Sequence, residues 1–207
     1  MRASFPRRFR ALLVLGLYLA GCADMAYRHM NDPSRDAWQK PKAVIEKLAI
    51  KPGARVADLG AGGGYFTWPL AEAVGPEGTV YAVEIDETAL AIISKEMKAR
   101  GITNVVPIRA DPHDAKIPEP VTLVFSCDTY HHMEDRVAYF RSLLRYLSPD
   151  AQVVILDFHP HGFFSGLLGH GTDKAVVQRE MEAAGYRLVE DFALIDRQHF
   201  QLFSRKN

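Results

Sequence analysis

The chain has 207 residues, of which 48% are hydrophobic and 24% charged, and its 25 basic residues balance 25 acidic ones. This length suits one domain with a sizeable core, and the composition is ordinary for a soluble globular protein. Nucleic acid is not the expected partner, because phosphate binding needs clustered Lys and Arg. The only cysteines are Cys22 and Cys127, which excludes a disulfide framework.

The first 21 residues have the pattern of a secretory signal segment. They contain four arginines and no acid, and three of the arginines directly precede an apolar run over residues 11–20. That run is too short for an ordinary transmembrane helix. Its end, Leu19-Ala20-Gly21-Cys22, resembles the lipobox of bacterial lipoproteins. The resemblance implies cleavage before Cys22 and lipidation of its sulfur, and hence a membrane anchor in the cell envelope. An uncleaved anchor and a misassigned start codon are the alternatives.

The residues after the signal divide into a tether and one domain. Residues 22–37 are mostly polar and include the turn cluster Asn31-Asp32-Pro33-Ser34, which is typical of a linking segment. A helix is expected over 38–50, where apolar residues recur at helical spacing, and Lys51-Pro52-Gly53 ends it. The domain is therefore expected to cover residues 38–207.

From residue 55 onward, short apolar runs alternate with amphipathic segments. The expected helices lie at 65–74, 87–100, 135–146 and 174–184. The expected strands lie at 55–59, 79–83, 105–109, 121–125, 152–157, 186–189 and 200–203. This alternation predicts an α/β, Rossmann-like domain with a mainly parallel seven-stranded sheet and helices on both faces. Residues 110–120 leave barely enough room for a helix, so that crossover should be truncated or irregular.

One glycine-rich run follows the first expected strand and opens a helix. It reads Asp58-Leu59-Gly60-Ala61-Gly62-Gly63-Gly64-Tyr65, at the edge of the sheet where such folds bind ligands. A dinucleotide fingerprint would need a third glycine at Tyr65, so an NAD-dependent oxidoreductase is disfavoured. An acid beside the loop would also repel a pyrophosphate, whereas it suits an ammonium group.

The spacing Asp58-x-Gly60-x-Gly62-x-Gly64 resembles motif I of the class I S-adenosylmethionine-dependent methyltransferases. The resemblance covers residues 38–203 and implies S-adenosylmethionine as cofactor. It departs from the family before the fifth strand, where Ser148-Pro149-Asp150-Ala151 replaces the usual Pro-Gly-Gly turn. The motif residues expected to contact the cofactor are Asp58, Gly60, Ala61, Gly62, Gly64 and Tyr65.

Three further acids follow later strands, and the resemblance gives each an expected position. Glu84 should accept hydrogen bonds from the ribose hydroxyls. Asp111 should accept from the adenine amino group, although a local turn beside Pro112 explains it equally well. Asp128 lies in the loop after the fourth strand, whose first residues run alongside the cofactor in this family.

The same loop contains the candidate catalytic residues His131 and His132. Histidine titrates in the range useful for taking a proton from a hydroxyl acceptor, but each of the two could instead be a packed, hydrogen-bonded core residue. Residues 158–171 are rich in glycine and aromatics and form either a lid or a packing loop. No tight ligand spacing accompanies the histidines, so we expect no metal site.

These residues together predict a methyltransferase that acts on a small-molecule or lipid-like acceptor. The alternative is a membrane-tethered binding protein that retains the fold without transferring a methyl group. Export also conflicts with a cofactor made in the cytoplasm. Either the cofactor is bound before export, or the signal is not used and the protein is cytoplasmic, or the exported protein binds another ligand.

Overall fold

The computed structural model describes Tyr27 and residues 31–160 and 171–206. The expected signal segment, Cys22 and most of the expected lid lie outside these residues. Within the described ranges, no helix has the length and apolar character needed to cross a membrane.

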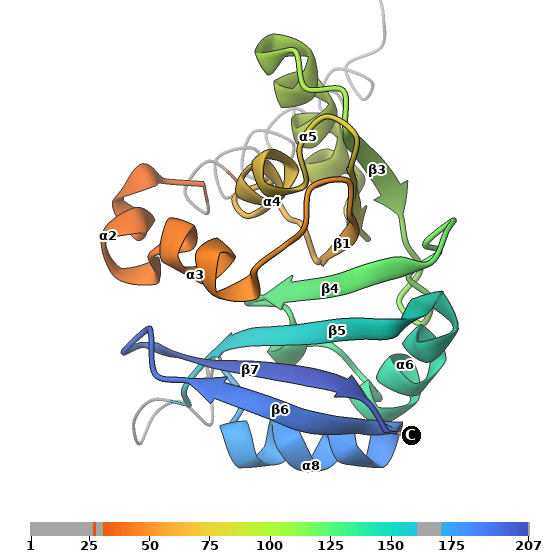
Figure 1. Cartoon of the computed structure of the whole chain (residues 1–207). Coiled ribbons are helices and arrows are strands. Elements are labelled where there is room, and N and C mark those ends of the chain that lie inside the picture. The colour runs from red at the N-terminus through yellow and green to blue at the C-terminus, as the bar shows by residue number, and fades with distance from the viewer. Residues whose placement is uncertain (1–26, 28–30, 161–170, 207) are drawn as a thin grey trace, which may run out of the picture.

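A seven-stranded sheet lies at the centre, with the strand order β3-β2-β1-β4-β5-β7-β6 (Figure 1). Strands β1 to β5 run parallel, and β7 is antiparallel to both of its neighbours. The chain order reverses between β1 and β4, the place where α/β sheets bind ligands. The strands are β1 (Arg55–Leu59), β2 (Thr79–Glu84), β3 (Val105–Arg109), β4 (Val121–Cys127), β5 (Leu147–Phe158), β6 (Tyr186–Phe192) and β7 (Gln198–Arg205).

Helices cover both faces of this sheet, as the alternating sequence pattern predicts (Figure 1). Apolar side chains of α3, α4 and α5 belong to one buried cluster, and those of α6 and α8 belong to a second. The α-helices are α2 (Asp36–Gln39), α3 (Pro41–Leu48), α4 (Thr67–Val74), α5 (Glu87–Arg100), α6 (Arg136–Leu143) and α8 (Lys174–Ala184). Short 3₁₀ helices are η1 (Pro33–Arg35), η2 (Tyr130–His132) and η3 (Leu144–Tyr146).

The structure differs from the sequence expectation near the first helix. The single helix expected over 38–50 is two helices, since Lys40 takes a left-handed conformation with φ of 51° between α2 and α3. Pro41 explains the break, because proline lacks an N–H and disfavours the helical conformation in the residue before it. Proline suits the first turn of α3, where an N–H would lack an intrahelical partner.

The start of β5 differs from the sequence expectation, whereas the connection before β4 agrees with it. Strand β5 begins at Leu147, five residues before the expected start, so Ser148 to Ala151 extend the strand instead of forming a turn. Residues 110–120 contain no helix, and an isolated bridge joins Asp111 to Asp114, in agreement with the expected irregular crossover.

Part of the expected tether packs against the domain. The Asn31 amide donates to the Gly63 carbonyl oxygen at 2.7 Å, and Arg35 pairs with Asp128 at 2.9 Å. Asn31 and Arg35 of the expected tether therefore lie against the domain.

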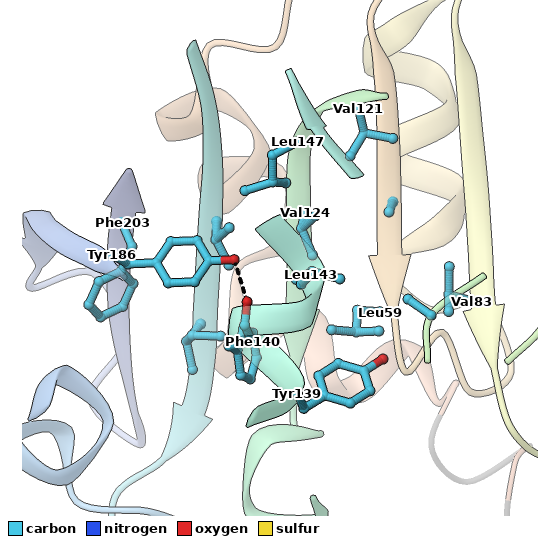
Figure 2. Packing of buried hydrophobic residues seen from close by; sticks show 14 of the residues in the cluster. Leu59, Val83, Val121, Val124, Tyr139, Phe140, Leu143, Leu147, Tyr186 and Phe203 are labelled. Atoms are coloured by element: carbon cyan, nitrogen blue, oxygen red, sulfur yellow. Dashed lines mark hydrogen bonds between the residues drawn. The ribbon is translucent and has the colours of Figure 1, made fainter. Parts of the chain in front are cut away.

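A buried tyrosine at the start of β6 is hydrogen-bonded to α6 within the core (Figure 2). Tyr186 is fully buried at the start of β6, and its hydroxyl donates to the Phe140 carbonyl oxygen in α6 at 2.8 Å. The C-terminal carbonyls of a helix lack intrahelical donors. In a regular helix the Leu144 N–H would bond to the Phe140 carbonyl oxygen, but here it bonds to those of Arg141 and Ser142. The Tyr186 hydroxyl therefore supplies a donor to the Phe140 carbonyl oxygen.

Replacing Tyr186 with phenylalanine should therefore lower the free energy of unfolding by about 1–3 kcal/mol, the cost of leaving a buried acceptor unpaired. Urea denaturation of both proteins measures the difference. Tyr81→Phe is the matched control, because Tyr81 is also buried but its hydroxyl makes no hydrogen bond to any described residue. Equal losses in the two variants would contradict the capping role.

Candidate functional site

A cavity of about 800 Å³ opens at the carboxyl ends of β1, β2, β3 and β4. Each of these strands contributes the residues that directly follow it, and the N-terminal segment contributes Tyr27, Asn31 and Arg35. Since these four strands are parallel, their carboxyl ends lie along one edge of the sheet. The cavity therefore lies at the switch point that the fold makes available for a ligand.

The loop after β1 contains three glycines with positive φ, and two of them, Gly60 and Gly62, line the cavity. These angles are 75° at Gly60, 52° at Gly62 and 94° at Gly64, a region that strongly favours glycine. At Gly60 a Cβ atom would overlap the side chain of Thr129, whereas at Gly62 it would meet nothing within 4 Å. The first glycine thus permits close packing against the loop after β4, and the second leaves open space for a ligand.

Asp58 lies beneath this loop at the end of β1 and is almost fully buried. Its carboxylate accepts a hydrogen bond from the Thr67 hydroxyl at 2.6 Å. Burial raises the pKa of Asp58 to about 7, and the charge of Glu84 adds to the increase although the Thr67 hydrogen bond opposes it. A cationic group placed beside Asp58 would favour its ionised form, because opposite charges stabilise each other.

Glu84 joins the end of β2 to the glycine loop. One carboxylate oxygen accepts from the Gly62 N–H at 2.9 Å, and the other accepts from the N–H groups of Ile85 and Asp86 at 2.7 and 3.0 Å. Ile85 lines the cavity with 52% of its surface exposed. An exposed apolar side chain beside a carboxylate suits a ligand with a flat apolar part and adjacent hydroxyls.

The sequence left open whether Asp111 faces the ligand or belongs to a local turn, and in the structure it does both. It lines the cavity after β3, and it also forms a local backbone bridge with Asp114. Its side chain is exposed and pairs with Lys116 at 2.7 Å. A ligand group at the β3 end of the cavity would therefore meet a carboxylate that already pairs with Lys116.

Asp128 lies in a buried polar network that the sequence did not reveal. It accepts from Arg35 at 2.9 Å, from the Gln39 amide at 3.4 Å and from the Gln198 amide. The guanidinium of Arg35 also lies over the Tyr65 ring, 4.4 Å from its centroid. The four-residue spacing of Arg35 and Gln39 is a sequence signal for a shared helical side, but a polar segment before Pro41 is equally typical of a tether.

The two adjacent histidines have different surroundings. His132 is exposed and lines the cavity. His131 is half-buried with its side chain only 6% exposed, and its Nδ1 lies 2.6 Å from a carboxylate oxygen of the fully buried Asp157. The two imidazoles contact each other, with their centroids 4.0 Å apart.

Most of the residues expected from the sequence converge on one cavity, while two of them lie outside its lining. Gly64 packs against Trp68, and His131 turns toward Asp157. Among the described residues, no group of three or more His, Cys, Asp or Glu side chains is arranged to hold a metal ion. The expected residues that line the cavity are Asp58, Gly60, Ala61, Gly62, Tyr65, Glu84, Asp111, Asp128 and His132.

The sheet order, the glycine loop and the acid after β2 define the class of fold, which is that of the class I methyltransferases. Residues 56–150 match the family model described as a methyltransferase domain. Among solved structures, a SAM-dependent methyltransferase from Aquifex aeolicus has a TM-score of 0.79 at 24% identity, and the match covers 86% of this chain and 96% of that chain. The magnesium protoporphyrin IX methyltransferase ChlM of Synechocystis, solved with bound SAH, has a TM-score of 0.64 at 18% identity over 81% of this chain and 82% of that one.

Curated relatives cover the same region. The ubiquinone/menaquinone biosynthesis C-methyltransferase UbiE of Ectopseudomonas mendocina is 32% identical over 124 residues, which make up 58% of this chain and 47% of that protein. The demethylmenaquinone methyltransferase of Geobacillus stearothermophilus is 29% identical over 124 residues, or 58% of this chain and 51% of that protein. The chain thus spans about half the length of the curated relatives it matches.

The packing at Gly60 generates a prediction about stability. Alanine at either Gly60 or Gly62 should cost about 1–2 kcal/mol for the left-handed backbone. Gly60→Ala should cost roughly 1–3 kcal/mol more, because its Cβ would overlap Thr129 in a packed interface. Urea denaturation of the two variants measures this difference, and equal stabilities would show that the β1 and β4 loops do not pack as described.

Proposed function

We propose that this protein is an S-adenosylmethionine-dependent methyltransferase. The observation that carries the proposal is the convergence of Asp58, the glycine loop and Glu84 on one cavity at the switch point. The cofactor is S-adenosylmethionine, which is supported by the methyltransferase domain match and by the related fold solved with bound SAH.

The order of the strands gives the bound cofactor a direction. Glu84, the last residue of β2, would accept the ribose hydroxyls, since a carboxylate has two oxygens for two donors. Ile85 and Asp111, which line the cavity toward β3, would hold the adenine ring. The buried Asp58 carboxylate in β1 would hold the ammonium group of the methionyl end. His132 and Met133, which line the cavity after β4, would then face the acceptor.

The reaction is an in-line displacement. S-adenosylmethionine, when bound, would supply an electrophilic methyl group to the acceptor, and the electron pair of its carbon–sulfur bond would stay on the sulfur. Positioning supplies much of the acceleration, because two reactants are held in the required geometry. Loss of a hydroxyl proton would make the acceptor more nucleophilic. The imidazoles of His113 and His132 both line the cavity, and His132, in η2 after β4, is the proposed base.

We further propose a small acceptor with an aromatic hydroxyl, of the quinol type. Two relatives support this proposal, a ubiquinone/menaquinone biosynthesis C-methyltransferase and a demethylmenaquinone methyltransferase, each matched over 58% of this chain. A cavity lined by Ile85, Met133 and Tyr139 beside acids and a histidine suits such an amphipathic molecule.

Calorimetry with S-adenosylmethionine, S-adenosylhomocysteine and NAD tests the cofactor. The first two should bind, and NAD should not. Glu84→Ala should weaken binding of both by roughly 1.5–3 kcal/mol, the loss expected for hydrogen bonds to a charged group. Glu87→Ala is the matched control, because Glu87 lies at the start of α5 and outside the cavity lining. Binding of NAD alone, or an unchanged affinity in folded Glu84→Ala, would overturn the cofactor assignment.

Transfer of a labelled methyl group to reduced short-chain demethylmenaquinone tests catalysis. Labelled product supports the enzyme. Cofactor binding without transfer to this acceptor or to a panel of phenols and catechols would favour the alternative, a binding protein that retains the fold.

The different surroundings of the two histidines predict different kinetic effects. His132→Asn should lower turnover by about 100-fold or more with cofactor affinity unchanged, as expected when a general base is lost. His131→Asn should lower turnover less, because that ring is directed at Asp157 and not at the cavity. The labelled-methyl assay measures both. A large loss in His131→Asn with normal turnover in His132→Asn would reverse the assignment.

A further inference from the structure

A buried carboxylate lies behind the two histidines of η2. Asp157 is fully buried near the end of β5, and alternation along the strand places its side chain on the same face as Val153 and Ile155, which belong to the cluster shared with α6 and α8. One of its oxygens lies 2.6 Å from Nδ1 of His131, and the other has no hydrogen-bond partner among the described residues. In the described part of the chain, this acid therefore has one partner for its charge.

Burial requires that this partner carry a compensating charge. A carboxylate in a protein interior is costly unless it pairs with a cation or accepts several hydrogen bonds. Asp157 has no lysine or arginine partner within the described ranges, and it makes one hydrogen bond there. An imidazolium at His131 meets the requirement, because it makes the pair neutral overall. Both nitrogens of that ring then carry hydrogens, so His131 has no lone pair with which to accept another proton.

A second imidazole beside Asp157 does not supply this charge. His199 pairs with Asp157 across β5 and β7, but its Nε2 lies 3.0 Å from the Thr172 carbonyl oxygen. A carbonyl oxygen only accepts, so Nε2 carries a hydrogen and a positive ring would need a second one on Nδ1. Burial lowers the pKa of His199, although the charge of Asp157 opposes the decrease. His199 therefore stays neutral, and the compensating charge falls to His131.

The two histidines of η2 are close enough for the charge of one to affect the other. Their ring centroids are 4.0 Å apart, and His132 lines the cavity whereas His131 does not. Two adjacent imidazoles resist double protonation, because like charges at such a distance repel each other. A positive charge held at His131 by Asp157 therefore disfavours protonation of His132. Different surroundings of neighbouring titratable groups are what separates their roles in acid–base chemistry.

Other charged and titratable groups come from each element packed around the pair. Burial raises the pKa of Asp128, Arg35 opposes this increase, and the charge of Asp157 adds to it, so a cation at His131 also offsets repulsion between these two acids. On α8, Glu180 accepts from the Tyr130 hydroxyl of η2 at 2.7 Å and is balanced by Arg136. The surrounding groups are Asp128 after β4, Glu134 after η2, Arg136 in α6, His159 after β5, Glu180 in α8 and His199 in β7.

We propose that Asp157 holds His131 as an imidazolium, and that this charge keeps His132 neutral and able to accept a proton. The inference rests on the proposed function, in which His132 is the base. The acceptor O–H bond breaks, its proton moves to the lone pair of His132, and the bonding electrons stay on the acceptor oxygen. Asp157 and His131 take no part in that transfer themselves, so both are positioning residues that act through His132.

Nuclear magnetic resonance of the full-length protein with isotope-labelled histidine tests the proposal without a cofactor or an acceptor. Ring spectra show which nitrogens carry hydrogens, and His131→Asn and His132→Asn assign the two rings. At about pH 7.5, His131 should be doubly protonated and His132 neutral. Asp157→Asn keeps an oxygen for Nδ1 but removes the charge. His131 should then lose a proton, and the titration midpoint of His132 should rise by about one pH unit, the effect of removing a charge about 4 Å away.

A second variant and a matched control separate charge from structure. His131→Asn removes the positive charge while Asp157 remains, and it should also raise the midpoint of His132. Glu180→Gln removes a carboxylate that is bonded to Tyr130 in the same 3₁₀ helix, and it should leave that midpoint at the parent value. In the labelled-methyl assay, the acidic limb of the turnover profile of Asp157→Asn should move to higher pH with the affinity for S-adenosylmethionine unchanged.

The outcomes decide the proposal independently of the proposed function. A neutral His131 in the parent protein at about pH 7.5 overturns it, and so does a His132 midpoint that fails to rise in Asp157→Asn and His131→Asn. An equal rise in Glu180→Gln also overturns it, because the effect would then come from a disturbed η2. Absence of methyl transfer overturns the proposed function, whereas the measured charges of the two histidines do not depend on transfer.

Discussion

The close approach of two loops at Gly60 is the constraint on which the cavity depends. The chain leaves β1 and must turn at once toward α4, while the loop after β4 passes directly beside it. A side chain on residue 60 would occupy the place of Thr129, so the approach requires glycine. The same turn directs the Gly62 N–H at Glu84, and the Gly60 and Ala61 N–H groups bond to the Val83 carbonyl. One backbone conformation therefore connects the ends of β1, β2 and β4.

That connection also explains why acids gather around the cavity. The strands β1 to β4 end at the same edge, and each contributes a carboxylate at or directly after its end: Asp58, Glu84, Asp111 and Asp128. Burial makes such a group costly to ionise, as the raised pKa of Asp58 shows. A ligand with two cationic centres offsets this cost, whereas a pyrophosphate would increase it. The electrostatics thus favour the same ligand class as the glycine spacing does, for an independent reason.

Much of the fold could be predicted from the sequence, because apolar periodicity reports which side of an element is buried. The ranges 55–59, 87–100, 105–109 and 174–184 agree with the observed elements. The early start of β5 could not be foreseen, since Ser148-Pro149-Asp150 has the composition of a turn. The first residue of β5, Leu147, pairs with Val121 of β4, which is distant in sequence, and the register of the two strands shifts after this pair.

Prediction of the site was limited in the same way. The glycine loop and Glu84 are local in sequence, so their spacing carries the information. The difference between His131 and His132 is not local. Both lie in the short 3₁₀ helix η2, in which successive side chains are about a third of a turn apart. One ring therefore faces the buried Asp157 and the next faces the cavity, and the sequence alone does not show which face is which.

The polar partners of Asp128 extend this argument to the whole chain. Asp128 lies within the region 56–150 that matches the methyltransferase family, but Arg35 and Gln39 come from before it and Gln198 from after it. Gln198 is at the start of β7, the antiparallel strand inserted between β5 and β6. The matched region supplies the glycine loop and the acids, while the flanking segments supply the arginine and the two amides that bond to Asp128. The surroundings of Asp128 in the cavity are therefore set by how those flanks fold onto the sheet, and not by the matched region alone.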